Sequence, residues 1–142
     1  MKKLIVFVVV ALAIPTSVAL AKPPATHTSQ SKAAPKVMYV LKGSLSAFTA
    51  ATTTTDGSIS ITVAHANFHG RALKGETLTF AVASNTKITN QNGKTQTTVA
   101  DGTKGMVKFR APLRVPATAG PLATALPTMA KAFHVIVNKA TS

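Results

Sequence analysis

The sequence predicts an all-β fold, in which five short strands form a small barrel or sandwich. Three observations support this prediction. Apolar residues alternate with small polar residues at a period of two, which is typical of half-buried strands. Turn-forming Gly, Asn and Asp residues separate these segments. After residue 21, no stretch of the sequence has sustained helical periodicity.

Residues 1–21 have the pattern of a secretory signal peptide. Two lysines open the segment, the apolar run 4–14 follows, and the small residues Ala19 and Ala21 precede the expected cleavage site. The alternative is a membrane anchor, but this apolar run is shorter than the ~20 residues that span a bilayer. We therefore expect the signal helix to be cleaved after Ala21. The product is then a secreted or periplasmic protein without a transmembrane segment.

Residues 22–36 are expected to form a disordered lead. This segment contains three prolines, three lysines and no large apolar residue, so it cannot bury enough surface to offset the entropy of ordering. One β-barrel domain, residues 37–139, follows the lead. Because the chain has no cysteine, neither a disulfide framework nor a thiolate metal site is available.

The first strand is expected over residues 37–48, with Met38, Val40 and Leu45 facing inward. The alternation changes phase at Gly43, which indicates a β-bulge. A bulge there would bend the strand and let it serve both sides of a closed sheet. An Asp-Gly turn then leads into the second strand.

The second and third strands are expected over residues 58–64 and 76–83, and the other segments pack around this pair. Their apolar residues fall on one face of each strand: Ile59, Ile61, Val63, Leu78, Phe80 and Val82. The polar segment 84–98 is expected to be a turn region, in which Ile88 is the single large apolar residue.

The fourth strand is expected over residues 106–111. Val107 and Phe109 alternate there with Lys108 and Arg110, so one face carries core residues and the other carries two cations.

Residues 112–131 contain four prolines, which predicts a surface or binding loop with room for one short helical turn near residues 122–126. The fifth strand is expected over residues 132–138, where Phe133, Val135 and Val137 alternate with His134 and Ile136. It has apolar residues on both faces, which is typical of a strand that closes a barrel.

Four motifs carry a resemblance to a known group of proteins: residues 39–43 (YVLKG), 57–63 (GSISITV), 86–88 (TKI) and 101–108 (DGTKGMVK). Their order is similar to that in exported bacterial domains of unknown function, whose strands are thought to form an oligonucleotide/oligosaccharide-binding (OB)-like barrel. The resemblance implies a small five-stranded OB-like barrel. It brings no activity and no catalytic residues, and the two-histidine linker and the proline-rich stretch depart from its pattern.

The formal net charge of +13 bears on partners and solubility and not on fold. The three acidic residues, Asp56, Glu76 and Asp101, each lie beside a glycine at an expected turn, which leaves few candidates for carboxylate chemistry. The sequence also lacks a Gly-x-Ser-x-Gly elbow and a glycine-rich phosphate loop. We therefore expect no enzyme activity and no cofactor.

We expect no metal site, and His65 and His69 are the single candidate that would contradict this expectation. Their spacing of four places two imidazoles on one face of a helix, as in His-Glu-x-x-His sites. Here the intervening residues include no Glu, and the context is a strand running into a loop. Two solvated histidines are the alternative that this context favours.

Basic residues give the candidate binding face. Six cations on or near the fourth strand and the histidine linker, with two aromatic residues beside them, make up the expected set: Arg71, Lys74, Lys104, Lys108, Arg110, Arg114, Phe68 and Tyr39. Such stripes on small barrels bind single-stranded nucleic acid or sugars. The alternative is that dispersed lysines keep a Thr-rich protein soluble.

These observations predict a non-enzymatic secreted binding or structural module that associates with anionic cell-envelope or extracellular polymers. An anionic membrane surface is a further candidate partner. Single-stranded nucleic-acid binding by the same OB-like barrel is the alternative function. It is the weaker one, because lipid head groups and wall or capsule polymers are abundant anions outside the membrane. The sequence leaves the oligomeric state open.

Overall fold

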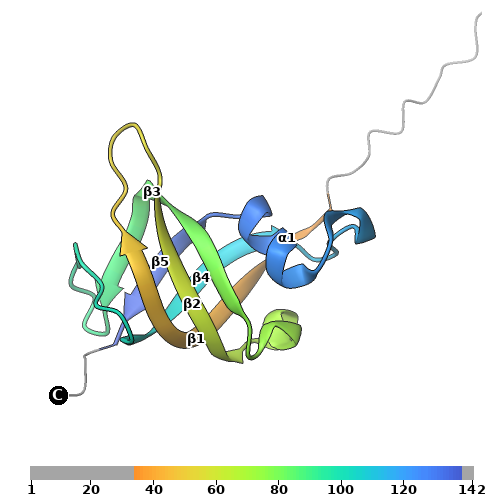
Figure 1. Cartoon of the computed structure of the whole chain (residues 1–142), viewed down its shortest axis with the longest axis horizontal. Coiled ribbons are helices and arrows are strands. Elements are labelled where there is room, and N and C mark those ends of the chain that lie inside the picture. Colours follow the sequence, from red (N-terminus) through yellow and green to blue (C-terminus); the bar gives the residue numbers. More distant parts are fainter. Residues whose placement is uncertain (1–33, 139–142) are drawn as a thin grey trace, which may run out of the picture. The chain divides into compact units, whose positions relative to one another are not determined.

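The computed structural model describes residues 34–138, in which five strands form one sheet that closes on itself (Figure 1). The expected signal peptide, residues 1–21, lies outside the described residues, as does the expected lead up to residue 33. The last residue assigned to that lead, Lys36, already begins the first strand. Among residues 34–138, no helix has the length and apolar character needed to cross a membrane.

The strands follow one another along the chain with three short helices in the connections. Their bounds are β1 Lys36–Thr49, β2 Gly57–Ala66, β3 Thr77–Asn90, β4 Lys104–Pro112 and β5 Ala132–Val137. The helices are the 3₁₀ turns η1 Phe68–Leu73 and η2 Ala117–Ala119, and the α-helix α1 Leu122–Met129. The prediction of a β-rich domain with five strands is confirmed.

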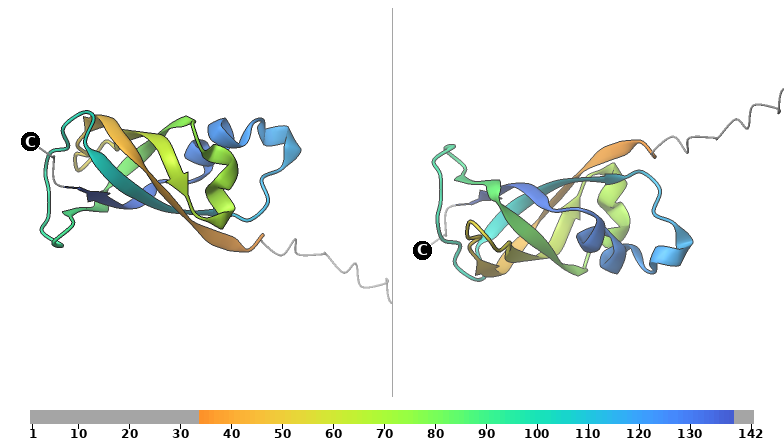
Figure 2. Two further views of the ribbon diagram at one scale, coloured as in Figure 1. Left: turned by 90° about the horizontal axis from the view of Figure 1, so that it is seen from below. Right: turned by 90° about the horizontal axis from the view of Figure 1, so that it is seen from above.

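The sheet runs in the order β1-β2-β3-β5-β4, and β4 pairs back with β1. All neighbours are antiparallel except β3 and β5, which are parallel. The first half of β1 pairs with β4 and its second half pairs with β2, so one long strand joins both sides of the closed sheet. Figures 1 and 2 show η1 and α1 at the same end of this sheet.

The expected phase of β1 is wrong in its first half. Tyr39 and Leu41 are buried, whereas Met38 and Val40 face outward and Met38 is 40% exposed. Because residues 37–41 are all apolar, their alternation could not decide which set faces inward.

The irregularity predicted at Gly43 is present, but the extra residue lies on the partner strand. Lys42 pairs with His65 and Gly43 pairs with Val63, so Ala64 of β2 is the unpaired residue.

A second bulge in β1 is centred on Ala47, whose φ of 47° lies in the left-handed region. The backbone N–H of Ala47 donates to Oδ1 of Asp101 at 2.8 Å. Asp101 was expected only as a turn residue. In the fold it also fixes the bulge that ends β1.

β3 has 14 residues and is longer than expected, because the polar segment that begins at Ser84 continues as strand to Asn90. The Thr86 hydroxyl accepts from Ala83 N at 3.0 Å and donates to Ala132 O at 2.7 Å, which joins the polar half of β3 to β5. Beyond this point β3 pairs in parallel with β5. Pairing with β5 therefore makes this polar segment a strand, although its sequence has no alternation that predicts one.

β5 departs from the predicted alternation at its start, because Phe133 does not share the buried side of Val135 and Val137 but faces outward and is 41% exposed. A register shift between Lys108 and Phe109 of β4 places Ala132 in the core instead. In the proline-rich stretch, α1 is longer than the single turn expected and contains Pro127. Leu126 of α1 is fully buried, so this helix closes one end of the core.

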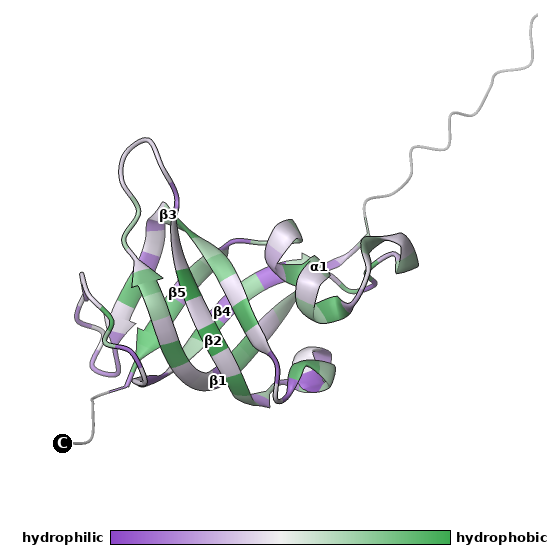
Figure 3. Cartoon of the chain, in the orientation of Figure 1, coloured by the Kyte–Doolittle hydropathy of each residue, from purple (hydrophilic) through white to green (hydrophobic). Residues whose placement is uncertain are grey.

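Aromatic stacking occupies the centre of the core. The Tyr39 and Phe109 rings are stacked with centroids 5.0 Å apart, and Phe80 packs on Phe109 at 4.5 Å. Figure 3 shows the hydrophobic positions as alternating bands along the strands. The inward alternation of β2, β3 and β4 is as the sequence predicts.

Candidate functional site

The outer surface of the closed sheet is divided into two chemically different faces. The first is made by the second half of β1, by β2 and by the first half of β3. We call it the hydroxyl face and define it by its outward side chains: Ser44, Ser46, Ser58, Ser60, Thr62, Thr77 and Thr79. Cross-strand hydroxyls are bonded to one another, Ser60 to Thr79 at 2.7 Å and Thr62 to Thr77 at 3.0 Å. This face therefore has small polar side chains whose hydrogen bonds are partly satisfied within the sheet.

The second face is made by the first half of β1, by β4, by β5 and by the second half of β3. We call it the cationic face and define it by Lys42, Lys87, Lys104, Lys108, Arg110 and His134. Lys108 is directly opposite His134, and His134 is directly opposite Lys87, so these three side chains form a row across three strands. The sheet thus gathers cations from three strands, β1, β3 and β4, around His134 of β5.

Among residues 34–138, no carboxylate lies on the cationic face. The three acidic residues of the chain all lie outside the strands, in connections. Asp56 pairs with Lys131 at 2.5 Å, and Asp101 accepts from the backbone of β1. Because like charges share this side of the sheet without a counter-ion from the part of the chain that the structure describes, the face can gain attraction from an external anion.

His134 lies between the two lysines of the row, so the pKa of its ring depends on their charges. Its Nε2 is 3.0 Å from the Thr89 hydroxyl. Burial lowers the pKa of His134, and the charges of Lys108 and Lys87 lower it further. The free protein thus resists adding another positive charge at the centre of the face.

The structure brings together only part of the cation set that the sequence predicts. Lys104, Lys108 and Arg110 share the outer side of β4. Arg71 lies in η1 and Lys74 follows it, at the end of the sheet, so they do not belong to the strand-borne row.

Arg114 follows β4 in the connection to η2, also outside the strand-borne row. Lys42 and Lys87 are the cations that the sequence analysis missed. The sequence feature that could have identified them is an apolar neighbour. Lys42 directly follows Leu41, and Lys87 directly precedes Ile88, and both apolar residues are buried.

Tyr39 is not beside the cations, contrary to expectation. Its side chain is 2% exposed, its ring stacks on Phe109, and its hydroxyl donates to Pro112 O at 3.3 Å. Burial also raises the pKa of Tyr39. A ligand on the surface therefore cannot stack on this ring.

Phe68 is on the surface, as the sequence predicts, with 76% of the residue exposed. It lies in η1, and the Arg71 guanidinium is 4.7 Å from the centroid of its ring. The preceding residue, Asn67, holds η1 against β1 by bonding Met38 O at 2.8 Å. Phe68 therefore stands next to the β1 border of the cationic face.

The two histidines of the linker lie in different elements. His65 is in β2 opposite Lys42, whereas His69 is in η1, where its ring packs 6.1 Å from Tyr39 and 5.6 Å from Phe68. Within residues 34–138, no group of three His, Cys, Asp or Glu side chains is arranged to hold a metal ion. A lysine opposite His65 also disfavours a cation there.

In comparisons with known proteins, no family model, no curated protein and no solved structure matches the chain. The resemblance to exported bacterial domains therefore remains a prediction. A function for this chain has to be argued from the cationic face itself.

Proposed function

We propose that this protein is a non-enzymatic binding module that associates with anionic polymers of the cell envelope or the extracellular space through its cationic face. The observation that carries the proposal is the gathering of Lys42, Lys87, Lys108 and their neighbours on one side of the sheet without a carboxylate. Extended polyanions gain most from such a face, because several charges act at once and bound counter-ions are released.

The OB-like interpretation of the fold belongs to this proposal. A closed sheet with a long shared β1 and a parallel β3-β5 pair supports it. OB barrels commonly bind their ligands on the face of strands 2 and 3. In this chain β2 and the first half of β3 carry the hydroxyl face, which has neither cations nor aromatic rings among its defining residues. We therefore place the contact with polyanions on the cationic face, over β4, β5 and the second half of β3.

The proposed location is outside the cytoplasm, either secreted or periplasmic. The support is the signal-peptide pattern of residues 1–21. Wall, capsule and extracellular polymers are the anions that such a protein meets.

Salt dependence tests the proposal. The mature chain, residues 22–142, should bind fluorescein-labelled dextran sulfate, and log Kd should rise linearly with log salt between about 25 and 200 mM because charge contacts release counter-ions. Uncharged dextran with the same backbone is the control and should not bind. The measurement is fluorescence anisotropy at pH 7.5. Salt-insensitive binding of dextran sulfate, or no binding at low salt, contradicts the proposal.

Single-stranded nucleic acid is the second candidate ligand. The observation in its favour is the exposed Phe68 ring with Arg71 beside it, since bases stack on such surfaces. If nucleic acid is the ligand, Phe68→Ala should weaken binding of oligothymidine much more than binding of dextran sulfate. Equal and small effects on both polymers favour the proposal above.

A further inference from the structure

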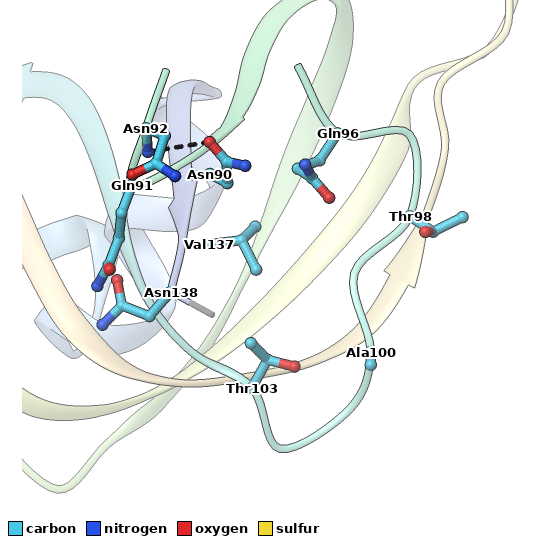
Figure 4. A pocket seen from close by; sticks show the side chains of 9 residues that line it. All are labelled: Asn90, Gln91, Asn92, Gln96, Thr98, Ala100, Thr103, Val137 and Asn138. Atoms are coloured by element: carbon cyan, nitrogen blue, oxygen red, sulfur yellow. Dashed lines mark hydrogen bonds between the residues drawn. The ribbon is translucent and has the colours of Figure 1, made fainter. Parts of the chain in front are cut away.

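A second surface feature lies where β3 and β5 end, away from η1 and α1. It is a hollow of about 440 Å³ beside the connection from β3 to β4 (Figure 4). Most of the side chains around it are uncharged carboxamides. Thr98 and Thr103 lie at one side, and Val137 lies between the carboxamides and these threonines. The carboxamides are those of Asn90, Gln91, Asn92, Gln96 and Asn138.

The carboxamides differ in what they already bind. Oδ1 of Asn90 accepts from the backbone N–H groups of Asn92 at 3.0 Å and Lys94 at 2.9 Å, so this side chain shapes the turn. Within residues 34–138, the side chains of Gln91, Gln96 and Asn138 make no hydrogen bond with another residue. They therefore retain both donors and acceptors for a ligand.

The chemistry of the hollow fits a sugar ring. A carboxamide offers a donor and an acceptor side by side, which matches two adjacent hydroxyl groups. Val137, which is 8% exposed, adds an apolar contact for the C–H groups of a ring. Pockets that combine apolar lining with a few placed polar groups are typical of small-ligand sites. A charged phosphate or carboxylate would find no lysine or arginine among the lining residues.

The hollow shares the lining residue Gln96 with a second hollow that borders the cationic face. This second hollow, of about 530 Å³, is lined by Lys87, Thr89, His134 and the same Gln96. On the other side of the hollow, the backbone N–H of Asn138 donates to the carbonyl oxygen of Lys104 at 2.8 Å. This bond holds the end of β5 against β4, which carries part of the cationic face. A polymer that carries both hydroxyl and acidic groups can therefore contact the two sites together.

We propose that the polyanion bound by this protein is an acidic polysaccharide, with sugar hydroxyls held by Gln96 and Asn138 and acidic groups held by Lys87 and Lys108. This inference rests on the proposed function, since it names the class of polyanion that the cationic face binds. The hollow supplies selectivity for sugar, and the cationic face supplies attraction for charge.

The test compares two carboxylated polymers, polygalacturonate, which has a sugar backbone, and polyacrylate, which has a hydrocarbon backbone. The double variant Gln96→Met and Asn138→Leu replaces both carboxamides by apolar side chains of similar length. We expect it to bind polygalacturonate about tenfold more weakly than the unmodified protein, because two hydrogen bonds are lost. Its affinity for polyacrylate should change by less than about twofold.

A second measurement uses the unmodified protein and does not depend on a variant. In an NMR titration, the side-chain NH₂ signals of Gln96 and Asn138 should shift with polygalacturonate and stay in place with polyacrylate. Circular dichroism confirms that the double variant is folded. An equal loss for both polymers, or unchanged NH₂ signals at saturating polygalacturonate, overturns the inference and leaves the proposed function intact. If neither polymer binds at low salt, the proposed function itself fails.

Discussion

Replacing Gly43 by alanine is expected to destabilise the domain by about 3 kcal/mol or more, because the added methyl group has no space. A Cβ at this position would lie 1.8 Å from the carbonyl oxygen and 2.8 Å from the carbonyl carbon of Thr62. These are backbone atoms of the neighbouring strand, so a side-chain rotation cannot relieve the clash. Gly43 also pairs with Gly105 on the opposite strand, at the point where β1 passes from β4 to β2.

Gly93→Ala is the matched control for this substitution. Gly93 has a φ of 77°, and an added Cβ there would have no neighbour within 4 Å. Its cost therefore comes from backbone conformation alone and should be about 1 kcal/mol. Urea denaturation, followed by circular dichroism, gives both free energies of unfolding. Equal losses of stability in the two variants would show that the close approach of β1 to β2 at Gly43 is wrong.

The double variant Lys87→Gln and Lys108→Gln is expected to bind dextran sulfate about 10- to 100-fold more weakly at low salt. These lysines flank His134 on the cationic face, and each belongs to a different strand. Loss of two charge contacts should also reduce the slope of log Kd against log salt by about two. Fluorescence anisotropy over a salt series measures both quantities.

The matched control is Arg71→Gln with Lys74→Gln, which removes the same net charge from η1 and the residue after it. The cationic face is unchanged in this variant, so we expect a loss of affinity below about threefold, from the smaller overall field. A loss equal to that of the Lys87 and Lys108 variant would mean that net charge alone, and not the face, determines binding.

Much of the fold follows from the sequence because several strands have one clearly apolar side. In β2 and β4, Ile59, Ile61, Val107 and Phe109 alternate with polar or charged residues, and each is fully buried as predicted. The first half of β1 has no such contrast. Its orientation is set by the ring of Tyr39 packing on Phe109, which is a tertiary contact that periodicity does not encode.

The candidate site was predicted less completely than the fold. The cations of β4 were recognised because β4 alternates strongly. Lys87 was missed because the second half of β3 has polar residues on both sides and becomes a strand only by pairing in parallel with β5. The carboxamide hollow was also missed. It is built by residues from the end of β3, the following connection and the end of β5, and only the closure of the sheet brings these segments together.

The central claim is that polyanions bind over the row formed by Lys87, His134 and Lys108. The most direct test is an NMR titration of the His134 imidazole against pH, with and without dextran sulfate. In the free protein, burial and the two lysines hold the pKa of His134 below its ordinary value. We predict that saturating dextran sulfate raises this pKa, because sulfate groups beside the ring favour its charged form. A His134 pKa that stays unchanged while the polymer is bound would contradict the account.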